Sequence, residues 1–222
     1  MKSVLLGICV LLSIGAYSQD FKKDPRSENL KEDNYDAYQV SQISKTDLLK
    51  ALEIAGVRIF NCPIAPKFDQ TYKLVINLDE YVNGKKISTK NISPNQHNTY
   101  SFYEGEKLYF DYINELKFIA KDTESDSTAF LNVEVHGNTT GINLKKNKER
   151  KYQYYQWRRF YKADWVLDKE IPVLVFASSW YDKKNSIERF CGTVDLSRDK
   201  NATDELLKNS PHYFIISYKT FR

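Results

Sequence analysis

A run of aromatic side chains in residues 152–166 is the part of the sequence whose residue types best suit ligand binding. In a strand, alternate side chains share one face, which here carries Tyr155, Trp157, Arg159, Tyr161 and Trp165. If exposed, these rings form a rigid platform for a sugar or a protein partner, and Trp180 and Tyr181 extend it. The alternative, which the residue types favour, is that large aromatics fill the core.

Motifs for nucleophilic or nucleotide chemistry are missing from the sequence. It has no G-x-S-x-G, no P-loop and no G-x-G-x-x-G, and Ser178-Ser179 has no flanking glycines. A thiol nucleophile needs a nearby base, and Cys191 would have one only if the fold brings it next to His212. We therefore predict no catalytic residue and a protein that is not an enzyme.

Metal-ligating residues are scattered. His97, His136 and His212 are far apart, and neither H-E-x-x-H nor C-x-x-C occurs. Glu134 and His136 would share an outer strand face, roughly 7 Å apart at ~3.4 Å per residue, as a polar face or as an acid–base or metal pair. The acidic turn 122–127 lacks the Gly and Glu of an EF-hand. We predict no metal and no cofactor.

Carboxylate pairs keep one enzymatic alternative open. Glycoside hydrolysis needs two facing acids at about 5–5.5 Å or 6.5–9.5 Å. The sequence offers too many candidates to choose among, namely Asp79, Glu80, Glu134, Asp164 and Asp168.

The first residues predict export. Lys2 precedes the apolar run Val4–Ala16, which is shorter than the roughly 20 residues that span a bilayer, and Ala16 and Ser18 suit cleavage before Gln19. We predict a signal peptide over 1–18 and a flexible polar leader over 19–43. The mature chain would have no transmembrane segment and would be periplasmic, surface-associated or extracellular.

Two cysteines, Cys62 and Cys191, remain after such cleavage. In an oxidising compartment they could pair, closing a ring of about 130 residues worth roughly 4–5 kcal/mol. Equally, they could be separate buried thiols.

Charge does not indicate a nucleic-acid partner. The sequence has 33 Lys and Arg against 29 Asp and Glu. Its densest basic stretch, 145–151, is short and contains Glu149, which predicts a solvated loop.

One helix and many strands are expected. Ser44 and Asp47 form a capping box, an apolar stripe runs from Leu48 to Ala55, and Gly56 ends the helix, which we expect to lie against the sheet.

From Val57 the periodicity changes to two. Asn83-Gly84 and Glu104-Gly105 predict hairpins, Val173–Ala177 predicts a central strand, and Thr203–Lys208 predicts a short helical turn. About nine or ten short strands favour a mainly β fold. We predict a single antiparallel two-sheet β-sandwich, jelly-roll-like, over residues 44–222.

Three segments and the Lys-, Asn- and Tyr-rich composition resemble an uncharacterised family of secreted Bacteroidetes proteins. The segments are 78–85, 177–182 and 210–214, and the resemblance covers about residues 45–222. It implies the same compartment and brings no functional residues.

Together these features predict an exported, non-enzymatic protein that binds a glycan or an envelope or host protein. The alternatives are a secreted carbohydrate hydrolase and a structural envelope subunit, the latter recognised by an unpaired edge strand. The sequence does not fix the oligomeric state.

Overall fold

The computed structural model describes residues 44–64, 70–123, 127–160, 166–190, 195–196 and 200–222. The predicted signal peptide and leader lie outside these residues. Contacts divide the chain after Leu49, and both sheets belong to the second unit, Lys50–Arg222. Within the described residues, no helix is long and apolar enough to cross a membrane.

The smaller sheet has four antiparallel strands in the order β1 (Val57–Pro63), β6 (Glu115–Lys121), β7 (Thr128–Val135) and β8 (Asn138–Lys145). Its side chains follow the predicted alternation. In β7, Ala129, Leu131, Val133 and Val135 are buried, and the residues between them are not.

The larger sheet has six strands in the order β13 (Asp195–Leu196), β9 (Tyr155–Phe160), β10 (Ile171–Ser178), β14 (His212–Phe221), β2 (Lys73–Val82) and β3 (Lys85–Asn91). All neighbours are antiparallel except the short β13, which pairs parallel to β9. The mainly β, antiparallel sandwich predicted from the sequence is confirmed.

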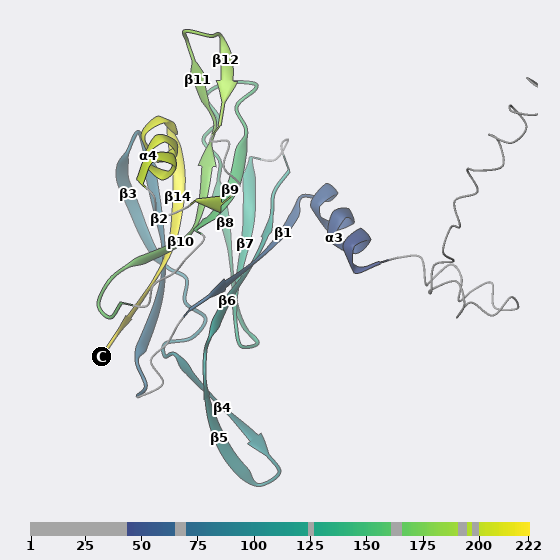
Figure 1. Ribbon diagram of the computed structural model, residues 1–222, viewed down its shortest axis with the longest axis vertical. Coiled ribbons are helices and arrows are strands. Elements are labelled where there is room, and N and C mark those ends of the chain that lie inside the picture. The colour runs from purple at the N-terminus through teal and green to yellow at the C-terminus, as the bar shows by residue number, and fades with distance from the viewer. Residues whose placement is uncertain (1–43, 65–69, 124–126, 161–165, 191–194, 197–199) are drawn as a thin grey trace, which may run out of the picture. The chain divides into compact units, whose positions relative to one another are not determined.

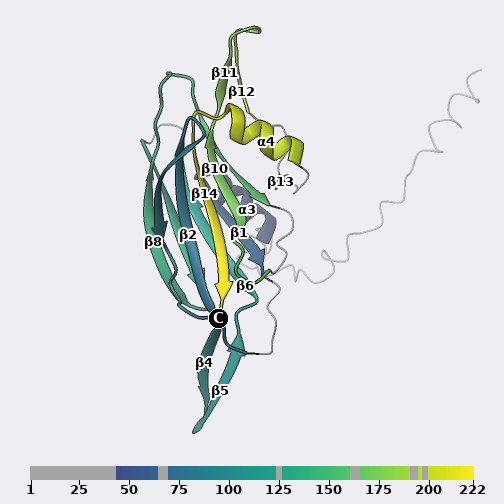
Figure 2. The ribbon, with the colours of Figure 1, turned by 90° about the vertical axis from the view of Figure 1, so that its left-hand side faces the viewer.

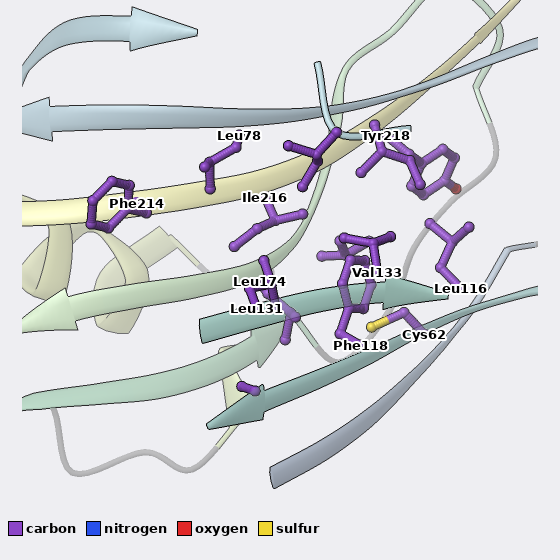
Figure 3. Packing of buried hydrophobic residues seen from close by; sticks show 14 of the residues in the cluster. Cys62, Leu78, Leu116, Phe118, Leu131, Val133, Leu174, Phe214, Ile216 and Tyr218 are labelled. Atoms are coloured by element: carbon purple, nitrogen blue, oxygen red, sulfur yellow. The ribbon is translucent and has the colours of Figure 1, made fainter. Parts of the chain in front are cut away.

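The main core lies between the two sheets (Figure 3). Phe118, Leu131 and Val133 of the smaller sheet face Leu174 and Ile216 of the larger one, and all five are fully buried. Burying a side chain of this size contributes roughly 1.5–3 kcal/mol.

A second cluster covers the opposite side of the larger sheet. Val175 and Ala177 of β10 pack there with Leu206 of helix α4 (Lys200–Asn209), so the predicted central strand is buried on both faces. The predicted helical turn is confirmed and extends to ten residues.

Two small hairpins complete the fold, β4 (Thr99–Glu104) with β5 (Lys107–Tyr112) and β11 (Trp180–Asp182) with β12 (Ile187–Arg189). Gly105 closes the first hairpin with a φ of 63°, and Asn83 and Gly84 join β2 to β3 with φ of 48° and 75°, as the Asn-Gly pair predicts. Figures 1 and 2 show β4 and β5 extending beyond the ends of the two sheets.

Helix α3 (Lys45–Ile54) forms where the capping box predicts it. The Asp47 carboxylate accepts hydrogen bonds from the backbone N–H and the hydroxyl of Ser44, at 2.9 and 2.7 Å. No residue of the helix is buried, and the division of the chain falls within it, so the expected packing of its apolar stripe against the sheet stays a prediction. Periodicity shows which side of a helix is apolar but does not show what covers that side.

Candidate functional site

The aromatic platform predicted on β9 is not an exposed surface. Trp157 is 3% exposed and stacks on Phe176 of β10 at 4.3 Å between ring centroids, and Tyr155 is also buried. Their face of β9 points toward the smaller sheet, so these two rings fill the core, as the alternative interpretation held.

The other members of the predicted platform are separated from these rings. Arg159 is exposed, Trp180 is half-buried on β11, and Tyr181 beside it is exposed. Tyr161 and Trp165 lie outside the described residues.

Tyr155 is held in a buried polar network. Its hydroxyl lies 2.7 Å from Nδ1 of His212 and donates to the carbonyl of Asn147 at 3.0 Å. Burial raises the pKa of Tyr155 well above its usual value. The other ring nitrogen of His212, Nε2, lies 3.1 Å from Glu80.

Both imidazole nitrogens of His212 are therefore engaged, and neither partner is a serine or a cysteine. Ser178 instead accepts a hydrogen bond from the His212 backbone N–H at 3.2 Å. This geometry does not activate Ser178 as a nucleophile, which would need a bond to the ring. We interpret the network as a structural connection between β9, β14 and β2.

Cys62 is a free, buried thiol in the core. Burial raises its pKa to about 12, and the nearby Arg159 acts weakly in the opposite direction. Cys191 lies outside the described residues, so the predicted pairing with Cys62 stays a prediction.

The basic stretch 145–151 is not simply a solvated loop. Lys146 is buried, forms an ion pair with Asp122 and donates to the carbonyl of Thr123. Arg150 pairs with Glu188 at 3.1 Å. Sequence reasoning missed these pairs because their partners are distant along the chain.

Among the residues that the structure describes, the projecting hairpin, which we call the arm (Thr99–Tyr112), carries the largest group of exposed aromatics. Tyr103 is 73% and Phe110 72% exposed. Residues opposite each other share a face in an antiparallel pair. Cross-strand register therefore puts Tyr103, Leu108 and Phe110 on one face, and Tyr100, Phe102, Tyr109 and Asp111 on the other.

The second of these faces forms an aromatic row. Phe102 and Tyr109 stack across the hairpin at 5.6 Å, and Tyr100 follows at 6.1 Å from Phe102. The His136 ring then stacks on Tyr100. His136 has a φ of 46°, an uncommon backbone conformation for a residue with a side chain.

A polar cavity of about 290 Å³ lies where this row meets the sandwich. Asp111 accepts hydrogen bonds there from the Tyr100 hydroxyl at 3.1 Å and the Tyr112 N–H at 2.7 Å. Desolvation, together with the bond to Asp111, raises the pKa of Tyr100. The remaining lining includes Tyr112, Asn114, Glu115, Lys117, Glu134 and His136.

The sequence-predicted pair Glu134 and His136 is thus brought to one cavity. Glu134 forms an ion pair with Lys117 of β6 at 3.4 Å, and His136 stacks on the arm. Among the residues that the structure describes, no cluster of three ligating side chains suits a metal ion. Sequence reasoning missed Tyr100, Tyr109 and Asp111, although the aromatic content of 99–112 was a usable signal.

Fold and site define an antiparallel β-sandwich protein with an aromatic arm and a polar cavity at the base of the arm. Residues 29–222 match a family described as a domain of unknown function, DUF5041, and the chain belongs to that family. No curated protein and no solved structure matches the chain. The likeness to an uncharacterised family is confirmed, whereas a Bacteroidetes origin and secretion stay predictions.

Proposed function

We propose that this protein is an exported, non-enzymatic binding protein that takes up a carbohydrate at the base of the arm. The observation that carries the proposal is the aromatic row in which Phe102 stacks on Tyr109 and is followed by Tyr100, which lines the polar cavity. Sugar rings have apolar C–H faces that pack on aromatic rings, and hydroxyls that bond to carboxylates and amides.

The arm leaves part of this row open to a ligand. Tyr109 is 40% exposed and Phe102 is similar. Cross-strand stacking restricts both rings, so little side-chain freedom is lost when a ligand binds.

The cavity supplies polar groups in fixed positions. Asp111 and Glu134 are held by the bonds described above. Glu115 and Asn114 add an acceptor and an amide to the lining. These groups suit recognition of several hydroxyls on a neutral sugar.

We favour binding over hydrolysis at this cavity. A glycosidase needs one carboxyl as proton donor and a second as nucleophile or base. Asp111 and Glu134 instead have hydrogen-bonding or ionic partners within the protein, which suits fixed acceptors for hydroxyls.

The proposal is tested by titrating the purified protein with neutral oligosaccharides selected on a glycan array, using calorimetry. Tyr109→Ala should weaken binding by about tenfold or more, because it removes one of the two partly exposed rings of the stacked pair. Tyr181→Ala is the matched control, since Tyr181 is 43% exposed but lies on β11 outside the arm, and it should bind within about twofold of the unmodified protein.

Several outcomes would overturn the proposal. If no glycan binds, or if Tyr109→Ala and Tyr181→Ala bind alike, the arm is not a sugar site. Release of reducing ends would establish the hydrolase alternative. Concentration-dependent assembly lost on changing Tyr103 and Phe110 would favour a structural subunit.

A further inference from the structure

A second cavity, of about 450 Å³, lies on the larger sheet where β2 begins and β14 ends. The segment that connects β3 to β4 contributes Ser93, Gln96 and His97 to its lining. Its volume falls within the roughly 300–1,000 Å³ of small-molecule sites. It shares no lining residue with the cavity at the base of the arm.

The lining of this cavity contains one lysine and is rich in hydrogen-bond donors. Lys73, His97, Gln96, Asn91 and Ser93 contribute to it, and no Asp or Glu does so among the described residues. By contrast, the other cavity is lined by three carboxylates.

Hydrogen bonds within the protein decide which groups of Asn91 and Ser93 remain available as donors. The Asn91 carbonyl oxygen accepts the Ser93 N–H at 2.8 Å, which leaves its NH₂ group as donor. The Ser93 hydroxyl oxygen accepts the Ile76 N–H at 2.6 Å, which leaves its O–H proton to donate.

Two lysines concentrate positive charge beside one aromatic ring. The Lys73 and Lys219 ammonium groups lie 5.9 and 5.7 Å from the Phe221 ring centroid. Neither forms an ion pair within the described chain. The face of the Phe221 ring attracts each ammonium group, and an anion bound near the ring would be attracted to both.

One carboxylate on this face of the larger sheet, Glu170, already has hydrogen-bond partners. Glu170 accepts bonds from Asn77 at 3.1 Å and from Ser217 at 2.8 Å. It therefore has partners of its own and does not neutralise the lysines by a direct ion pair.

We propose that this cavity binds a small organic anion. Its oxyanion group, a carboxylate, sulfate or phosphate, would lie against Lys73 and the Ser93 hydroxyl, and Lys219, beside the Phe221 ring at the edge of the cavity, would add a second positive charge. Its body would pack against the apolar wall formed by Phe221 and Val75. This inference does not rest on carbohydrate binding at the arm.

The test uses glucuronate as the organic anion, glucose as its neutral counterpart, and inorganic sulfate and phosphate as free oxyanions, each titrated by calorimetry at fixed ionic strength. At this cavity, reported by proton NMR of the His97 ring, we expect glucuronate to bind and glucose not to bind. Weaker binding of sulfate and phosphate than of glucuronate would show that the organic body adds to recognition of the oxyanion, and equal or tighter binding of either would make the free ion the ligand.

The variant pair Lys73→Ala with Lys219→Ala should weaken glucuronate binding by about tenfold or more. The control pair, Lys85→Ala with Lys90→Ala, removes the same charge from the exposed strand β3 and should leave binding within about twofold. Proton NMR of the His97 ring gives a local readout of binding. The ring resonances should shift on addition of glucuronate in the control double variant, as in the unmodified protein, and should not shift in the Lys73→Ala with Lys219→Ala variant.

Three results would overturn the inference. One is failure of every anion to bind. Another is an equal response of the His97 ring to glucose and glucuronate. The third is equal weakening in the two variant pairs, which would reduce the effect to net charge. Circular dichroism confirms that each pair folds, and because both lysine pairs are at least partly exposed we expect native spectra.

Discussion

Trp157→Ala separates the core interpretation of β9 from the binding-platform interpretation. Trp157 is 3% exposed, stacks on Phe176 and lies 6.2 Å from the Phe60 ring. Truncating a buried aromatic to alanine costs about 3–5 kcal/mol, because the transfer free energy is lost and a cavity remains.

This loss converts to a measurable change in melting temperature. For a domain of this size, each kcal/mol lowers Tm by about 2–4 °C, so we expect a decrease of about 6–20 °C. Tyr181→Ala, which removes a largely exposed ring, should change Tm by no more than about 2 °C.

Trp157→Phe refines the test. The indole N–H is buried and has no hydrogen-bond partner within the described residues. An unpaired buried donor costs about 1–3 kcal/mol, so phenylalanine removes this penalty while it loses some packing. We therefore expect the Phe variant to melt close to the unmodified protein and well above the Ala variant.

Scanning calorimetry or circular dichroism gives these values directly. If Trp157→Ala melts no lower than Tyr181→Ala, Trp157 is not in the core and the placement of β9 is wrong. If Trp157→Ala keeps its Tm and loses glycan binding, the platform interpretation of the sequence is restored.

Two further predictions concern ionisable groups. Burial tends to raise the pKa of Glu188, but hydrogen bonds from Arg150 and Ser179 lower it below the usual value. The ionised carboxylate therefore stabilises the fold above about pH 4.5, and this stabilisation is lost as the pH falls further. Glu188→Gln should therefore unfold at lower urea than the unmodified protein at pH 7, and an equal midpoint at pH 7 would contradict the ion pair. With the other two cysteines replaced by serine, Cys62 should resist a thiol reagent at pH 8 in the native state and react on unfolding, because its pKa is raised to about 12. Reaction at the rate of a free thiol would place Cys62 outside the core.

The strands could be predicted from the sequence because burial of one face of a sheet requires apolar and polar side chains to alternate along each strand. Leu74, Ile76 and Leu78 alternate with mostly polar residues along β2, and all three are buried. The Asn83-Gly84 turn was equally local, since the positive φ of both residues restricts which side chains fit.

The candidate site could not be read in the same way. Glu134 and His136 were paired from strand spacing, but Tyr100 and Asp111 join them only because β5 leads directly into β6 beside β7. The second cavity likewise combines Lys73 near the start of β2 with Phe221 at the end of β14.

The sequence by itself determined the class of fold, the hairpin turns and the lack of a known catalytic motif. Only the tertiary structure decided which aromatics are buried. Trp157 and Phe110 are both aromatic residues on strands, yet one packs between two sheets and the other lies on a hairpin that no sheet covers. Alternation of apolar and polar side chains indicates that the two faces of a strand differ. Which element packs on each face depends on contacts between residues far apart in the sequence, and a local pattern does not contain these.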